Sequence, residues 1–123
     1  MKKEDDKNET QKIARQPEFE GNIMEYVGYE MKYPQELKNL DVNIRVIYSF
    51  VVETDGSVSN IKLKTTYVEK DNKNPKVIEA QKLCEAEANR LITSTSGKWE
   101  PAKNEKGEKV RAEMYLPIWF KTH

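Results

Sequence analysis

The chain is 123 residues long and carries 21 basic and 21 acidic residues, so its formal charge is zero. A chain of this length is expected to be one domain that buries roughly two-thirds of its unfolded surface. Zero net charge gives no bulk attraction to nucleic acid or to an anionic membrane, so we expect no nucleic-acid partner. Cys84 is the only cysteine, and the only histidine is the terminal His123. These counts exclude an intramolecular disulfide and a multi-cysteine zinc site, and we expect neither a metal nor a cofactor.

The first sixteen residues hold nine charged side chains and only Met1, Ile13 and Ala14 as apolar ones. Such a composition cannot bury enough surface to offset the entropy of ordering. We therefore predict a disordered polar tail or linker over 1–16 and a folded domain over 17–123. No apolar run approaches the ~20 residues that span a bilayer, and the amino terminus has no apolar signal core. Taken literally this predicts a protein made without export, whereas in a fragment of a longer chain it says nothing.

Short elements are expected before residue 44. Phe19 is a candidate anchor in an extended lead-in, and Asn22 can cap a short helix whose apolar residues recur every three or four positions. Tyr33-Pro34 ends that helix, because the residue before proline is driven out of helical geometry. A second short helix is predicted from Gln35 to Leu40.

The stretch 45–64 has the pattern of a β-hairpin. Four side chains recur with period two and share one face of the first strand: Val46, Tyr48, Phe50 and Val52. Asp55-Gly56 suits the tight turn, since glycine takes positive φ without a steric penalty. In the second strand we expect Ile61, Leu63 and Thr65 on one side and Lys62 and Lys64 on the other.

A long helix and a final strand follow. Asn74-Pro75 provides a cap and a first-turn proline, so a helix is predicted from Pro75 to Ile92. One stripe of this helix is apolar or small and should lie on the sheet: Val77, Ala80, Cys84, Ala88 and Leu91, with Leu83 and Ile92 beside it. Residues 109–120 alternate as a strand. Because Pro117 cannot donate a ladder hydrogen bond, this strand is expected at an edge. The predicted fold class is α+β, a three-stranded antiparallel sheet with helices packed on one face.

Five segments, in order, resemble the carboxy-terminal domain of the TonB family of energy transducers. They are Pro17-Glu18-Phe19-Glu20-Gly21, Tyr33-Pro34, the hairpin from Arg45 to Val58, Trp99-Glu100-Pro101-Ala102, and Leu116-Pro117-Ile118-Trp119-Phe120. Two features depart from the family pattern. Ile44 stands where a glycine usually precedes the first strand, and the stretch before Trp99 is longer.

The resemblance implies a non-catalytic domain in the periplasm of Gram-negative bacteria. Such domains are joined through an upstream segment, missing here, to an inner-membrane helix and its proton-driven complex. They bind the TonB box, a short peptide of an outer-membrane transporter, and so couple transport to energy. Binding is by β-strand addition to the edge of the last strand, whose open N–H and C=O groups suit an extended peptide. The side chains that would tune specificity are Arg111, Glu113, Tyr115, Pro117 and Trp119.

Other readings of the same residues are weaker. The alternative function is a self-associating structural module that pairs through its sheet edge with a second copy, as a homodimer. An enzyme has no candidate residues: Cys84 lies on the apolar stripe as a buried, inert thiol, and Glu53 and Asp55 belong to a turn. Tyr48 and Phe50 could stack on nucleic-acid bases, but we expect the helices to cover them. Trp99 is expected in the core.

Overall fold

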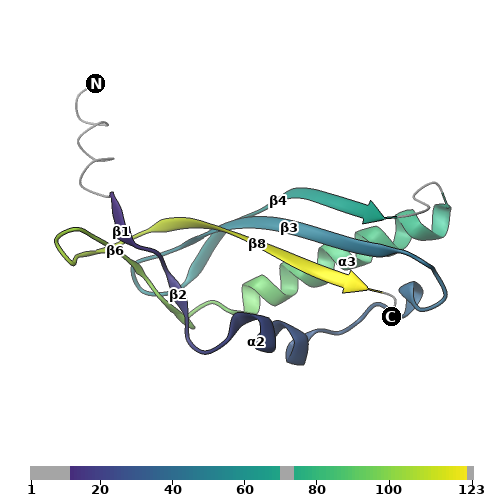
Figure 1. The fold of residues 1–123 in the computed structure, drawn as a ribbon, viewed down its shortest axis with the longest axis horizontal. Coiled ribbons are helices and arrows are strands. Elements are labelled where there is room, and N and C mark those ends of the chain that lie inside the picture. The colour runs from purple at the N-terminus through teal and green to yellow at the C-terminus, as the bar shows by residue number, and fades with distance from the viewer. Residues whose placement is uncertain (1–11, 70–73, 122–123) are drawn as a thin grey trace, which may run out of the picture.

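The structure is a computed structural model that describes residues 12–69 and 74–121. Its elements in chain order are β1 (Ile13–Arg15), β2 (Glu18–Phe19), α2 (Ile23–Glu30), the 3-10 turn η1 (Gln35–Leu37), β3 (Asn43–Val52), β4 (Val58–Glu69), α3 (Pro75–Ser94), β5 (Trp99–Glu100), β6 (Ala102–Asn104), β7 (Lys109–Val110) and β8 (Ala112–Lys121). Figure 1 shows three long strands side by side, with α3 running along them.

The main sheet has the strand order β4-β3-β8, and both pairings are antiparallel. This confirms the predicted α+β fold and the predicted edge position of the last strand. The central strand β3 carries the period-two apolar face, and every one of its members is buried: Ile44, Val46, Tyr48, Phe50 and Val52. Ile44 is therefore a core residue with no exposed surface.

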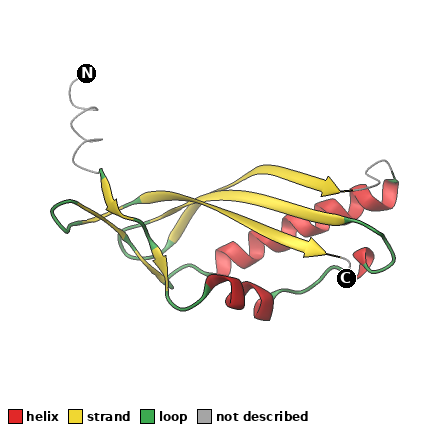
Figure 2. Cartoon of the chain, viewed as in Figure 1, coloured by secondary structure: helices red, strands yellow, loops and turns green. Residues whose placement is uncertain are grey.

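Helix α3 covers that face, as the small-residue stripe predicted (Figure 2). Asn74 caps the helix by accepting the Lys76 N–H at 2.8 Å. The Tyr48 hydroxyl donates to the Glu85 carbonyl at 2.9 Å, and the Thr66 hydroxyl donates to the Glu85 carboxylate at 2.6 Å. Two strands are thus tied to one turn of the helix. Tyr48 and Phe50 are covered, so they offer no stacking platform.

The second strand of the hairpin differs from its predicted pattern. The pairing of β3 with β4 is irregular between Ile47 and Tyr48 and again between Ser49 and Val51, and Asn60 has a positive φ of 49°. A β-bulge inserts one residue and reverses the facing of the residues beyond it, up to the next bulge. One irregularity lies between Leu63, opposite Tyr48, and Thr65, opposite Ile47, so these two residues do not share a face as expected, and Thr66 faces α3.

The Asp55-Gly56 turn is conformational, as predicted. Gly56 has φ +87°, and a Cβ at this position would lie 2.5 Å from the Trp99 carbonyl oxygen. Asp55 accepts the Ser57 N–H at 3.0 Å and the Ser57 hydroxyl at 2.6 Å, and these bonds hold the pKa of the Asp55 carboxyl below its usual value. The other carboxylate of this turn, Glu53, accepts hydrogen bonds from Arg111 and Ser59.

Two small sheets, β2-β5 and β1-β6-β7, have no counterpart in the sequence prediction. Ile13 of β1 packs on a second apolar cluster of Ala102, Val110 and Ala112, so order begins before Pro17, inside the stretch predicted as a tail. For residues 1–11, which lie outside the described range, the tail stays a prediction.

Two further boundaries were wrong: the helix expected over 35–40 is only the turn η1, and the last strand is interrupted at Arg111.

Trp99 is in the core, as predicted, with 6% of its surface exposed. Its indole N–H donates to the Thr95 hydroxyl at 2.9 Å, and its ring lies 5.3 Å from that of Phe19 and 5.6 Å from that of Phe50. Phe19 thereby anchors the lead-in strand β2 against the end of the hairpin.

Candidate functional site

The free edge of β8 is the candidate site. In an antiparallel pair the N–H and C=O of one residue point to the same side, and successive residues alternate between the partner and the outside. Glu53 directly follows β3 and continues the alternation of its odd-numbered residues. The Glu53 N–H donates to the Ser57 carbonyl, on the β4 side, at 2.8 Å. The odd-numbered residues of β3 therefore bond to β4. Their cross-strand partners on β8, which are also odd-numbered, must point away from the sheet.

Two more observations agree with this direction. Pro117, which has no N–H to give, occupies one of the outward positions, opposite Ile47. The carbonyl of Lys121, another outward position, accepts the hydroxyl of Tyr33. The outward groups between these ends are the N–H of Glu113, Tyr115 and Trp119 and the carbonyls of residues 113, 115, 117 and 119. Within the described ranges β8 pairs with β3 alone, and no other backbone hydrogen bond reaches residues 112–120.

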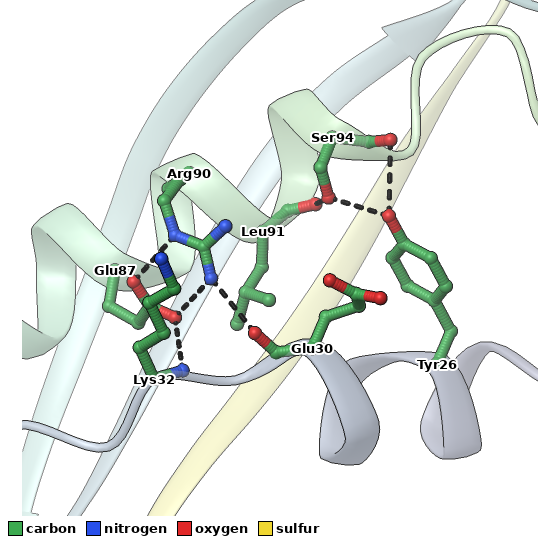
Figure 3. Close-up of polar contacts among 7 residues, drawn as sticks. All are labelled: Tyr26, Glu30, Lys32, Glu87, Arg90, Leu91 and Ser94. Carbon is green, nitrogen blue, oxygen red and sulfur yellow. Dashed lines mark hydrogen bonds and ion pairs between the residues drawn. The ribbon is translucent and has the colours of Figure 1, made fainter.

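Tyr33, which bonds to the end of this edge, follows Lys32, and Figure 3 shows the polar cluster of Lys32 with Glu87 and Arg90 of α3. The Lys32 N–H donates to the Glu87 carboxylate at 2.7 Å. Arg90 donates to both oxygens of the same carboxylate at 2.8 and 2.6 Å, and to the Glu30 carbonyl at 2.9 Å. Although partial burial opposes ionisation, the bonds from Arg90 and Lys32 hold the pKa of Glu87 below its usual value. The cluster fixes the segment between α2 and η1 against α3.

The predicted partner-binding residues all lie on the surface, on the face of the sheet opposite α3. Tyr115 is 55% exposed and Trp119 is 44% exposed, and Glu113, Pro117 and Arg111 are exposed as well. Four of the five are outward residues of β8, so they share one edge. Arg111 lies before the strand and is engaged elsewhere, in an ion pair with Glu53 at 2.9 Å.

The Arg111–Glu53 pair is a two-pronged contact. Arg111 donates from Nε and from Nη2 to the two Glu53 oxygens, each at 2.9 Å, and the Ser59 hydroxyl also donates to Glu53. These bonds, with that from Arg111 the largest, lower the pKa of Glu53 to about 2. The pair joins the turn of the hairpin to the start of β8.

A second feature of the open face was not predicted from the sequence. Arg45, Tyr67 and Trp119 lie directly opposite one another across the three strands. The Arg45 guanidinium carbon is 4.3 Å from the Tyr67 ring centroid and 5.0 Å from that of Trp119. The alternation of β3 and β8 placed Arg45 and Trp119 on outer faces. Tyr67, however, reaches this row only through the bulges of β4, for which the sequence carries no signal.

The described residues contain no group of three His, Cys, Asp or Glu side chains placed to hold a metal ion. Burial, the largest effect, and the nearby Glu85 and Glu87 raise the pKa of the Cys84 thiol to about 12, so it is not a thiolate nucleophile. His123 lies outside the described residues. No helix in the described part of the chain is long and apolar enough to cross a membrane.

The arrangement of one long helix on a three-stranded antiparallel sheet is similar to that of solved TonB carboxy-terminal domains. A solved structure with this fold is that of the Helicobacter pylori TonB carboxy-terminal domain, residues 179–285, determined in solution by NMR. It has a TM-score of 0.53 and 18% sequence identity, over 80% of this chain and 76% of that one. A shorter form of the same domain, residues 194–285, is similar at 20% identity with a TM-score of 0.48. No protein-family model matches the sequence, and no curated protein matches it.

Proposed function

We propose that this domain is a non-catalytic peptide-binding module that takes up an extended segment of an outer-membrane transporter, its TonB box, by β-strand addition at β8. The observation that carries the proposal is the row of outward N–H and C=O groups between Glu113 and Trp119, which are unpaired within the described residues. An added strand would gain main-chain hydrogen bonds there, and alternate side chains would contact the exposed Tyr115 and Trp119.

The same proposal gives the domain its setting. It would act in the periplasm, carried by an upstream segment from an inner-membrane, proton-driven complex. The likeness to the H. pylori domain supports the fold on which this rests. The five partner-facing residues then have different roles. Glu113, Tyr115 and Trp119 offer N–H groups and side chains, Pro117 offers a carbonyl alone, and Arg111 braces the start of the strand.

The test is a titration of isotope-labelled domain with synthetic TonB-box peptides. We expect amide shifts concentrated over 111–121, and loss of binding when alternate peptide amides are N-methylated on one edge of the peptide but not on the other. Shifts spread elsewhere, or equal binding of both N-methylated peptides, would show that pairing at β8 is not the mode of binding.

A matched pair of variants isolates the main-chain contribution. Glu113→Pro removes an outward N–H, whereas Glu113→Ala removes the side chain and keeps that N–H. We expect the proline variant to weaken binding about tenfold or more, as the loss of a main-chain hydrogen bond with local distortion requires, and the alanine variant to change it much less. A folded Glu113→Pro variant with unchanged affinity would rule out this edge.

Self-association is the second candidate, because the sheet has two edges, β4 and β8. The bulges of β4 twist its edge and make it a poor template, so a homodimer would use β8 too. Sedimentation velocity with and without peptide separates the two functions. A dimer that persists when peptide is added, without shifts over 111–121, would favour the self-associating module.

A further inference from the structure

A pocket on the open face of the sheet adjoins the β8 edge, with which it shares Trp119. It has a volume of about 350 Å³ and is lined by Asn43, Arg45, Tyr67, Val68, Glu69 and Trp119. Asn43, Glu69 and Trp119 of the lining belong to the end of the sheet where β4 and β8 finish, and Figure 1 shows these two strand ends on the same side of the molecule. We propose that this pocket binds a carboxylate of a polypeptide partner, with the Arg45 guanidinium as its anchor.

The cation in this pocket has no carboxylate partner in the described part of the chain. Arg45 contacts two aromatic rings, and its Nε is shielded from solvent without a hydrogen-bond acceptor there. Two other arginines, Arg90 of α3 and Arg111 just before β8, each form an ion pair with a glutamate. Arg45 differs from them, because its guanidinium group remains available to an external anion.

The two rings also hold the guanidinium ready for such an anion. Stacking between Tyr67 and Trp119 fixes the plane of the group, so little side-chain entropy is lost when a ligand binds. A carboxylate matches the planar fork of a guanidinium through two parallel hydrogen bonds. A second cation, the Lys121 ammonium, lies 5.3 Å from the Trp119 ring centroid and adds to the attraction.

The other polar side chains of the pocket indicate which kind of anion fits. Glu69 lines the pocket, and its carboxylate accepts the Asn43 side-chain amide at 2.8 Å. The charges of Arg45, Lys121 and Glu69 sum to one positive charge, which a singly charged carboxylate neutralises, whereas a phosphate with up to two negative charges would leave uncompensated negative charge beside Glu69. The pocket thus favours an acidic side chain or a chain terminus over a phosphate. This site does not depend on strand addition at β8, and it can be tested without a TonB-box peptide.

The test uses short peptides and the two indole signals. Acetyl-Ala-Glu-Ala-amide, its Gln counterpart, acetyl-tri-alanine with a free carboxylate, and inorganic phosphate are each titrated into labelled protein. We expect the Glu peptide to shift the Trp119 indole N–H and the Arg45 Nε–H saturably, while the buried Trp99 indole stays in place. A matching response to the free terminus alone would assign the site to a chain end. A response to the Glu peptide assigns it to an acidic side chain.

Variants complete the test. Arg45→Gln should weaken binding of the Glu peptide about tenfold or more, as expected for loss of a charge-assisted hydrogen bond. Arg45→Lys keeps the charge without the planar guanidinium, and Tyr67→Leu removes one ring, so both should weaken binding of this peptide to a smaller extent. Arg15→Gln, an exposed arginine on β1, is the matched control and should bind as the native chain does. The proposal is overturned if the Gln peptide or phosphate shifts the signals as much as the Glu peptide, or if the folded Arg45 variants bind normally.

Discussion

At the scale of single residues, long-range polar contacts link the hairpin turn, β8 and the inter-helix segment. Arg111 reaches Glu53 at the far end of β3, and Tyr33 reaches the carbonyl of Lys121. Neither contact could be predicted from the sequence, because the partners are 58 and 88 residues apart and no local pattern joins them. What the sequence did predict was the surface position of Tyr115 and Trp119, which follows from strand alternation alone.

The Arg111–Glu53 pair should make stability depend on acid. The pKa of Glu53 is about 2 in the folded chain, below its ordinary 4.5. A lowered pKa stabilises the fold above about pH 4.5, and this contribution is lost as the pH falls toward 2. Because the pair is on the surface, its contribution to the free energy of unfolding is small, about 1 kcal/mol or less. Arg111→Ala should therefore lower the free energy of unfolding at about pH 6, and the difference from the native chain should shrink in acid.

The measurement is urea unfolding of both chains across this pH range. Glu53→Gln and the double variant complete a double-mutant cycle. The cycle separates the interaction free energy of the pair from the effects of changing either side chain alone. A difference in unfolding free energy that stays constant down to the acid end would mean that Arg111 does not act through Glu53.

At the scale of elements, the long segments were predictable and the short ones were not. Helix α3 follows from its cap and its apolar stripe, and β3 from its alternation, since both patterns extend over many residues. Strands β1 and β6 have three residues each, too few to show a period, and only Ile13 packs on the second cluster from β1. The bulges of β4 arise from its pairing with β3, so the facing of Thr65 could not be read from β4 alone.

The polar cluster on α3 should govern the segment between α2 and η1. Glu87 is 10% exposed at its side chain and receives bonds from Lys32 and Arg90. Glu87→Ala removes the acceptor of the Lys32 N–H, so we expect faster hydrogen exchange at that amide and a loss of about 1 to 3 kcal/mol in unfolding free energy.

Glu79→Ala is the matched control for this change, because Glu79 is an exposed carboxylate on the same helix. It should leave the Lys32 amide as protected as in the native chain. Unchanged protection in Glu87→Ala would instead mean that packing of η1 and its buried Leu37, and not the polar cluster, holds the segment.

At the scale of the whole molecule, the proposed function requires the open β8 edge to pair with a peptide but not with a second copy of the domain. An edge strand with a complete row of N–H and C=O groups is a template for pairing between copies. Pro117 interrupts that row near its middle, because it supplies a carbonyl but no N–H. The Tyr33 hydroxyl, bonded to the Lys121 carbonyl, closes the row at its end. Together they shorten the run of free main-chain groups along β8, which should disfavour pairing between two long strands.

Pro117→Ala restores the missing N–H at an outward position and should therefore raise the tendency to self-associate. We expect a concentration-dependent dimer in sedimentation velocity where the native chain at the same concentration has less or none. Glu113→Ala, which changes an outward side chain but adds no N–H, is the control and should sediment as the native chain does. If Pro117→Ala stays as monomeric as the native chain while its amide spectrum shows an intact fold, the proline does not protect the edge, and the charged side chains beside it must do so.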